Sequence, residues 1–368
     1  QTWSTPVPTK IDVDGRARSV VIFAGGYDET QDNHDPSTDE TGTGLYIVDA
    51  VTGALLWHGG PSDATRTFSD MRYSMPADVK VIDLDGDGFA DRIYAADMGG
   101  QVWRFDIFNG RPASQLVTGG VIARLGAAAN PAEASRADAR RFYYAPDVAL
   151  ATTGGRTFLH IGIGSGYRAH PDSTDTQDRF YALRDHQPFK HLSQQEFAAR
   201  NVVTDEDLVD VTDELDAAIE PGSPGWKLRL GPGEKVLAEA RTFADQVFFT
   251  TFTPGTAADE NDCEPRVGTN RLYVVSLFNA APANTLDRRV DDDPIGGDGP
   301  HRDPVRSIEF AGLLGGSVSF LFPSVEDPTS CVGDGCAPLP LICVDLFCQP
   351  TGFDNLPVRT YWRQEHVD

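Results

Sequence analysis

Residues 91–106 read DRIYAADMGGQVWRFD, and this stretch decides the fold. An apolar run carrying Tyr94 is followed by Asp97, a glycine pair and a second run that contains Trp103. Aspartate and glycine are typical of tight turns, and short apolar and aromatic runs on either side of a turn are typical of β-strands. The stretch therefore predicts two strands joined by a short turn.

The same order of residues recurs along the chain. Residues 44–57 read GLYIVDAVTGALLW, and weaker echoes occur at residues 178–185 and 270–275. Repeated units of a few strands bury a face only by stacking on their neighbours, as the blades of a propeller do. The 36 glycines and 25 prolines, together with short β-rich runs, argue against a helical or doubly wound fold. We expect an all-β protein, a modified β-propeller, over residues 1–368.

Small elements interrupt the predicted blades. Residues 193–220 are predicted to form a helical insertion outside the propeller, with two short helices that begin at the capping residues Ser193 and Thr204. The acidic stretch at residues 291–300 is interpreted as a solvated linker. Four tryptophans fall in strand-like runs and are expected in the cores of blades rather than on a carbohydrate platform: Trp57, Trp103, Trp226 and Trp362.

The residues just before the second strand pair predict a calcium site. Residues 83–91 read DLDGDGFAD, with carboxylates at loop positions 1, 3, 5 and 9 and Gly88 at position 6, where a tight turn needs glycine. Ca²⁺ takes about six to eight oxygen ligands, and a curled loop points alternate side chains inward. The predicted ligands are four carboxylates and one backbone carbonyl: Asp83, Asp85, Asp87, Asp91 and Phe89.

This loop differs from an EF-hand. Position 12 is Tyr94 rather than a bidentate glutamate, and strand-like runs lie on both sides, so we expect a strand–loop–strand site. The alternative is an Asp–Gly turn without a metal.

Charge and hydropathy exclude several classes of protein. Lys and Arg number 31 against 55 Asp and Glu, and the resulting net charge of −24 argues against nucleic-acid binding. No stretch approaches the roughly 18 apolar residues of a membrane helix, so we do not expect the chain to span a membrane.

Four of the five cysteines crowd into residues 331–348, at Cys331, Cys336, Cys343 and Cys348. Their spacing lacks the close pairs of a zinc site and predicts a segment stapled by disulfides, which indicates an oxidising compartment. Cys263 is left over. Two possibilities stay open for Cys263. It forms a bridge to a cysteine of the cluster, which leaves one free thiol there, or it is itself free.

At this point the chain resembles the PilY/PilC proteins of type IV pili, in their C-terminal domain. The resemblance rests on the strand pair at 44–57, the calcium loop and strands at 83–106, and shorter phrases at 20–28, 141–147, 162–171, 178–185, 233–236 and 359–364. It implies a propeller of about seven blades that is exported to the envelope of a Gram-negative bacterium. The periplasm or outer surface, and the pilus tip, are the implied locations.

In that family, calcium occupancy of the loop is linked to pilus extension against retraction, and the proteins serve as adhesins or surface sensors. The resemblance therefore implies minor pilins and pilus-tip proteins as partners, a host or abiotic surface as a further one, and a role in twitching motility. It does not extend to the adhesin-like N-terminal half of the longer members, and the chain contains no Arg-Gly-Asp tripeptide that would support integrin binding.

Two other functions are alternatives to this one. A generic calcium-dependent adhesin or lectin is compatible with the same residues. The repeated pattern of a glycine turn followed by a strand with tryptophan also resembles pyrroloquinoline-quinone dehydrogenases. These enzymes need calcium near the propeller axis with Glu and Asn ligands, whereas all the ligands predicted here lie within residues 83–91. Residues 162–166 read GIGSG and lack the G-x-S-x-G frame around Ser165. We therefore expect no enzymatic activity.

Overall fold

The computed structural model describes residues 3–255, 268–283, 305–310, 315–322, 340–344 and 347–350. Within these residues the strands form five sheets, which we number I to V in chain order. Sheet I contains β1 (Val7–Val13), β2 (Arg16–Ala24), β3 (Leu45–Asp49), β4 (Leu55–Gly60) and β5 (Arg66–Thr67). Sheet II contains β6 (Lys80–Ile82), β7 (Arg92–Ala96), β8 (Gln101–Ile107), β9 (Val117–Arg124) and β13 (Val203–Thr204).

The three later sheets are also built mainly from strands that lie close together in the chain. Sheet III contains β10 (Asp147–Thr153), β11 (Arg156–Gly164), β12 (Arg179–Asp185), β14 (Val209–Asp210) and β15 (Gly225–Arg229). Sheet IV contains β16 (Lys235–Val236), β17 (Arg241–Phe243), β18 (Gln246–Thr253), β19 (Thr269–Ser276) and β20 (Ser307–Phe310). Sheet V contains β21 (Val318–Leu321), β22 (Leu341–Val344) and β23 (Phe347–Pro350). Most neighbouring strands are antiparallel and consecutive in the chain.

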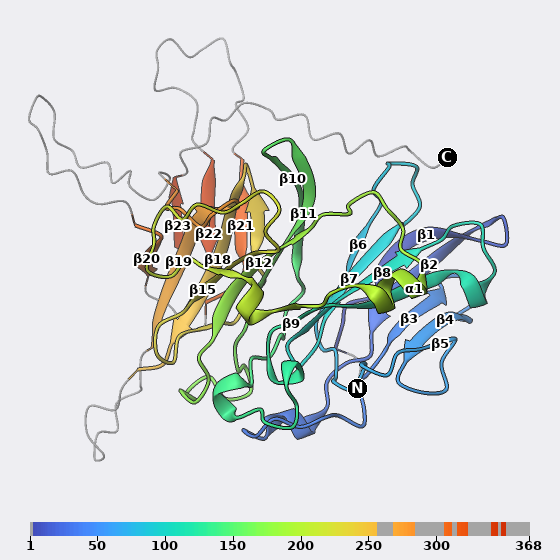
Figure 1. The fold of residues 1–368 in the computed structure, drawn as a ribbon, viewed down its shortest axis with the longest axis horizontal. Helices are drawn as coiled ribbons and strands as arrows, with labels where there is room; N and C mark the ends of the chain where they lie inside the picture. The colour runs from blue at the N-terminus through green and yellow to red at the C-terminus, as the bar shows by residue number, and fades with distance from the viewer. Residues whose placement is uncertain are drawn as a thin grey trace, which may run out of the picture.

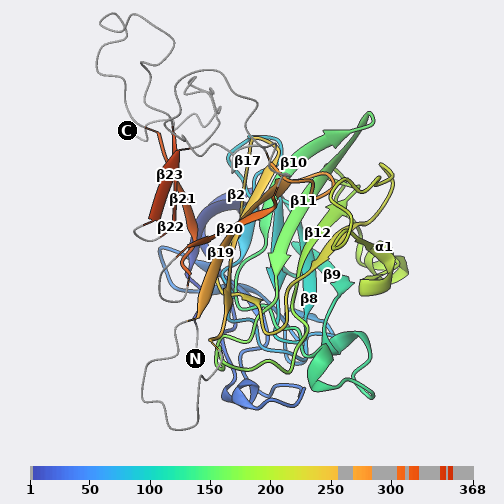
Figure 2. The ribbon, with the colours of Figure 1, turned by 90° about the vertical axis from the view of Figure 1, so that its left-hand side faces the viewer.

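Each sheet packs against the next one in the chain. A buried cluster joins sheets I and II through Trp57, Trp103 and Phe105, and another joins sheets III and IV through Phe180, Trp226 and Phe249. Two further clusters lie between sheets II and III and between sheets IV and V. Figure 1 shows the sheets following one another across the molecule, and Figure 2 shows sheet V beside β19 and β20.

This stacking is the arrangement predicted for propeller blades. Three of the four tryptophans expected in blade cores, Trp57, Trp103 and Trp226, are buried as predicted, while Trp362 lies outside the described residues. The expected number of blades, about seven, stays a prediction.

The stretch that decided the fold forms β7 and β8, which pair in antiparallel register from Arg92 opposite Asp106 to Ala96 opposite Val102. Asp97 organises the turn between them. Its Oδ1 accepts hydrogen bonds from the backbone N–H groups of Gly99 and Gln101, both at 3.0 Å. Its Oδ2 accepts one from the Trp103 indole at 2.8 Å.

Asp49 plays a related part between β3 and β4, where Oδ1 accepts from the N–H groups of Val51 and Thr52. The recurring aspartate therefore holds the turn that follows a strand.

We expect Asp97→Ala to lower the free energy of unfolding by about 2–3 kcal/mol, because it leaves three buried N–H donors without their acceptor. Urea unfolding followed by tryptophan fluorescence measures the change. Asp97→Asn is the matched control. Its side chain keeps one acceptor oxygen at the turn, so this variant should lose less stability than Asp97→Ala. Equal losses in the two variants would contradict the role given to these hydrogen bonds.

The insertion at residues 193–220 differs in part from its prediction. The first helix is present as α1 (Gln194–Ala199), capped by Ser193, and the second is a short 3₁₀ turn, η5 (Asp205–Asp207), capped by Thr204. The segment does not lie wholly outside the sheets. It adds β13 to sheet II, parallel to β9, and β14 to sheet III, parallel to β15. These strands are two residues long, too short to show a strand pattern in the sequence.

A disulfide joins Cys343 and Cys348, which face each other on β22 and β23. It confirms that the cysteine-rich segment contains a disulfide. Cys263, Cys331, Cys336 and the acidic linker at 291–300 lie outside the described residues. No helix in the described part of the chain is long and apolar enough to cross a membrane.

Candidate metal site

The predicted calcium loop connects β6 to β7 in sheet II. It is closed by a hydrogen bond from Asp91 N to the carbonyl of Ile82, at 2.8 Å. Just before this point, Ala90 N donates to the carbonyl of Lys10 in β1, also at 2.8 Å. The end of the loop is thus fixed to sheet II and to the neighbouring sheet I.

Three of the four predicted carboxylates come together. Asp83, Asp85 and Asp91 each offer an oxygen, and these oxygens all lie within 4.8 Å of one another. Asp85 is exposed, Asp83 is half-buried and Asp91 is buried. Asp87 does not join this group. It is exposed, and its Oδ1 accepts a hydrogen bond from the backbone N–H of Phe89 at 2.8 Å.

The loop keeps this shape through hydrogen bonds from its own backbone. Asp83 accepts from the N–H groups of Gly86 (2.7 Å) and Gly88 (2.8 Å), and Asp91 accepts from Leu84 N at 2.7 Å. Gly86 and Gly88 have φ values of +78° and +89°, a region that favours glycine. Gly88 therefore adopts the kind of backbone conformation for which glycine was predicted at this position, and Gly86 adopts it as well.

The electrostatics of the loop favour a cation. Burial raises the pKa of Asp91, and the charges of Asp85 and Asp83 raise it further, against the opposing effects of the Leu84 hydrogen bond and of His191. A divalent cation among these oxygens would relieve that repulsion. The donor set consists of carboxylate oxygens, which fits a hard ion such as Ca²⁺.

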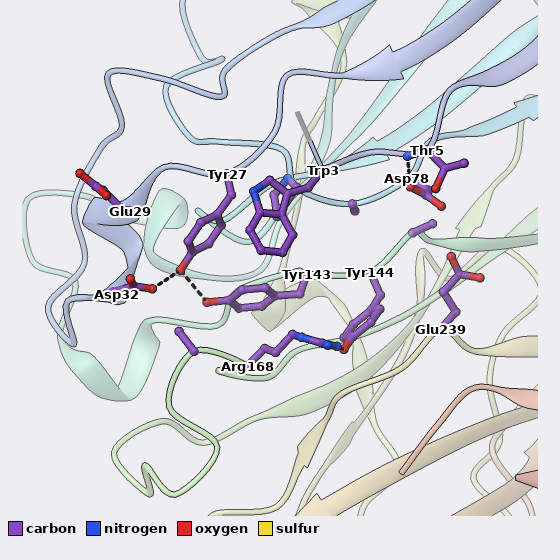
Figure 3. Close-up of a pocket in the computed structure, with 14 residues that line it drawn as sticks. Trp3, Thr5, Tyr27, Glu29, Asp32, Asp78, Tyr143, Tyr144, Arg168 and Glu239 are labelled. Carbon is purple, nitrogen blue, oxygen red and sulfur yellow. Dashed lines mark hydrogen bonds between the residues drawn. The ribbon is translucent and has the colours of Figure 1, made fainter. Parts of the chain in front are cut away.

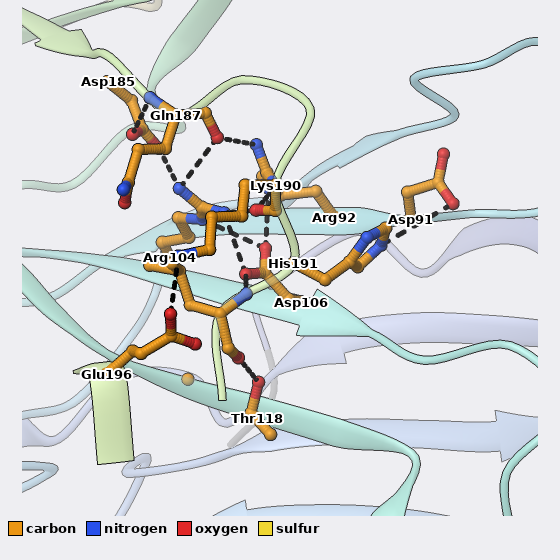
Figure 4. A network of polar contacts seen from close by, with 12 residues as sticks. Asp91, Arg92, Arg104, Asp106, Thr118, Asp185, Gln187, Lys190, His191 and Glu196 are labelled. Carbon is orange, nitrogen blue, oxygen red and sulfur yellow. Dashed lines mark hydrogen bonds and ion pairs between the residues drawn. The ribbon is translucent and has the colours of Figure 1, made fainter. Parts of the chain in front are cut away.

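A buried ion network begins at the residue after the loop. It consists of Arg92, Arg104, Asp106 and Asp185, whose side chains are all fully buried (Figure 4). Arg92 Nε lies 2.7 Å from Asp106 Oδ1, and Arg104 bridges Asp106 and Asp185 with contacts of 2.8 Å to each. Burial acts against ionisation of Asp185, but the guanidinium groups of Arg104, Arg200 and Arg92 and the Tyr94 hydroxyl lower its pKa to about 2.

The network also holds the segment that runs from sheet III toward α1. Arg92 donates to the carbonyl of Pro188 at 2.6 Å, and Leu192 N donates to Asp106 Oδ2 at 2.7 Å. In the same segment, His191 Nε2 lies 3.9 Å from Asp91 Oδ1. The loop at residues 83–91 of sheet II is therefore linked to the chain entering the 193–220 insertion.

Sequence reasoning missed this network. A signal was present, because Arg92 and Asp106 are opposite in the β7–β8 register, as are Tyr94 and Arg104. Charged residues at alternate positions of a strand otherwise rich in apolar residues indicate a polar cluster on one buried face.

No family model matches the chain. The type IV pilus biogenesis factor PilY1 homolog of Xylella fastidiosa is 25% identical over 282 residues, which cover 71% of this chain and 18% of that protein. The chain thus spans less than a fifth of the length of this curated relative.

The crystal structure of the Pseudomonas aeruginosa PilY1 C-terminal domain is similar in fold. Its TM-score is 0.58 at 18% sequence identity, and the match covers 96% of this chain and 72% of that one. This likeness confirms the predicted all-β, propeller-type fold.

Proposed function

Since the chain is related in sequence to the PilY1 pilus biogenesis factors and has the fold of a PilY1 C-terminal domain, we propose that it serves in type IV pilus biogenesis. The relative from Xylella fastidiosa is a type IV pilus biogenesis factor. Under this proposal the chain acts in the cell envelope, at the periplasm or outer surface. Its partners are minor pilins and pilus-tip proteins, with adhesion to a surface as a further role.

We further propose that the loop at residues 83–91 binds Ca²⁺ and that its occupancy biases pilus extension against retraction. Asp83, Asp85 and Asp91 would hold the ion, with the Phe89 carbonyl as an additional oxygen, and Asp87 would stay outside the ligands. The observation that carries this proposal is the convergence of three carboxylates within 4.8 Å. The position of the loop also supports this proposal. The loop ends next to Arg92, which belongs to the buried ion network.

The test of this function uses the full-length protein in its own bacterium. We expect Asp91→Lys to leave export intact but to change pilus number or twitching, because a lysine ammonium would occupy the cation position and fix the loop in a state that does not respond to calcium. Asp85→Ala is a second variant, and its exposed position spares the fold. Glu40→Lys, an exposed acidic residue between β2 and β3, is the matched charge control.

Surface-protein level and piliation are measured together over a range of calcium concentrations. Loss of surface protein in both loop variants would indicate that the ion only stabilises the fold, which contradicts the regulatory proposal. Normal levels with normal piliation and motility at every calcium concentration would contradict it as well.

A further inference from the structure

A cavity of about 650 Å³ lies where chain segments from four sheets meet (Figure 3). Its lining comes from the residues before β1, after β2, before β6, before β10, after β11 and between β16 and β17. A volume of this size is in the range of about 300–1,000 Å³ that ligand sites occupy. No residue of the calcium loop lines it.

Aromatic rings form one wall of the cavity. The ring centroids of Trp3 and Tyr27 are 6.0 Å apart, and those of Tyr27 and Tyr143 are 5.9 Å apart. Trp3 is 65% exposed, so much of its ring is accessible to a ligand. Burial raises the pKa of both Tyr27 and Tyr143, to about 12 for Tyr143, so that both hydroxyls are neutral at physiological pH.

The charged groups that line the cavity are mostly negative. Four carboxylates line the cavity, from Glu29, Asp32, Asp78 and Glu239, against the single guanidinium of Arg168. Of these carboxylates, Glu239 pairs with Arg241 at 3.0 Å. Arg168 is engaged already, because it lies over the Tyr144 ring at 5.5 Å and donates to the Tyr144 hydroxyl. On the aromatic wall, Asp32 Oδ1 accepts a hydrogen bond from the Tyr27 hydroxyl at 2.7 Å.

We propose that this cavity binds a basic side chain, a lysine, presented by a protein or peptide partner. An ammonium group is attracted to the faces of aromatic rings and to nearby carboxylates, and the aliphatic stem of lysine can cover the Trp3 ring. An anionic ligand is disfavoured by the four carboxylates. This inference concerns a site separate from the calcium loop and does not depend on the proposed function.

The test titrates the whole protein with acetyl-Gly-Lys-Gly-amide and follows binding by NMR chemical-shift changes. The peptide in which norleucine replaces lysine has a similar aliphatic stem without the ammonium group. We expect the lysine peptide to bind at least about tenfold more tightly than the norleucine peptide, and its affinity to fall as salt rises.

Two variants locate the binding. Trp3→Ala removes the exposed ring, and Asp32→Asn removes one charge while keeping an acceptor for the Tyr27 hydroxyl. Each is expected to weaken binding of the lysine peptide by about threefold to tenfold. Leu150→Ala and Glu206→Gln, at exposed positions that do not line the cavity, should leave it unchanged.

The proposal is overturned if the lysine and norleucine peptides bind equally, or if neither binds. It is also overturned if Trp3→Ala and Asp32→Asn bind the lysine peptide as the unmodified chain does. Tighter binding of cellobiose than of the lysine peptide in the same titration would assign the aromatic wall to a carbohydrate instead.

Discussion

We expect Asp106→Asn to lower the free energy of unfolding by about 3–5 kcal/mol, because it leaves two buried guanidinium groups without their shared anion. Asp106 is fully buried and accepts hydrogen bonds from Arg92 Nε, from two nitrogens of Arg104 and from the backbone N–H of Leu192. Asparagine has nearly the same shape but carries no charge. The loss therefore reports the electrostatic part of the network rather than a change in packing.

Guanidinium chloride unfolding measures this loss, and hydrogen exchange at Leu192 reports the local contact. Asp35→Asn is the matched control, because Asp35 pairs with Arg136 at 2.6 Å on the exposed surface, where an ion pair contributes little to stability. If Asp106→Asn were no more destabilising than Asp35→Asn, the network would have no special role in holding the insertion segment to sheet II.

The second large effect is expected on calcium binding. We expect Asp85→Ala to weaken the affinity for Ca²⁺ by at least about tenfold and Asp87→Ala by no more than about threefold. Asp85 belongs to the group of converging oxygens, whereas Asp87 lies outside it. Both residues are exposed aspartates in the same loop, so each variant is the charge-matched control of the other.

Isothermal titration calorimetry on the isolated chain measures both affinities. Binding should also raise the melting temperature of the unmodified chain, because an ion that binds only the folded state stabilises it by mass action. Absence of calcium binding by the unmodified chain would contradict the calcium site. Equal losses in the two variants would instead show that Asp87 joins the ligands when the ion binds.

The sequence identified those features whose residues are close together in the chain. The turn at Asp97 and the strands on either side of it lie within one stretch, so composition and order were enough to predict β7 and β8. The capping residues Ser193 and Thr204 marked the starts of α1 and η5 for the same reason. The predicted calcium loop is equally local, and three of the four carboxylates predicted as ligands lie together in the structure.

Only the tertiary structure decided which distant residues meet. Asp106 and Asp185 share Arg104 across 79 residues of sequence, and both Trp3 and Tyr143 lie beside Tyr27 in the cavity wall. Strand periodicity tells which side chains share a face, but it carries no information about what covers that face. The positions of β13 and β14 were also decided by the tertiary structure. A two-residue strand is fixed by the sheet edge with which it pairs rather than by its own sequence.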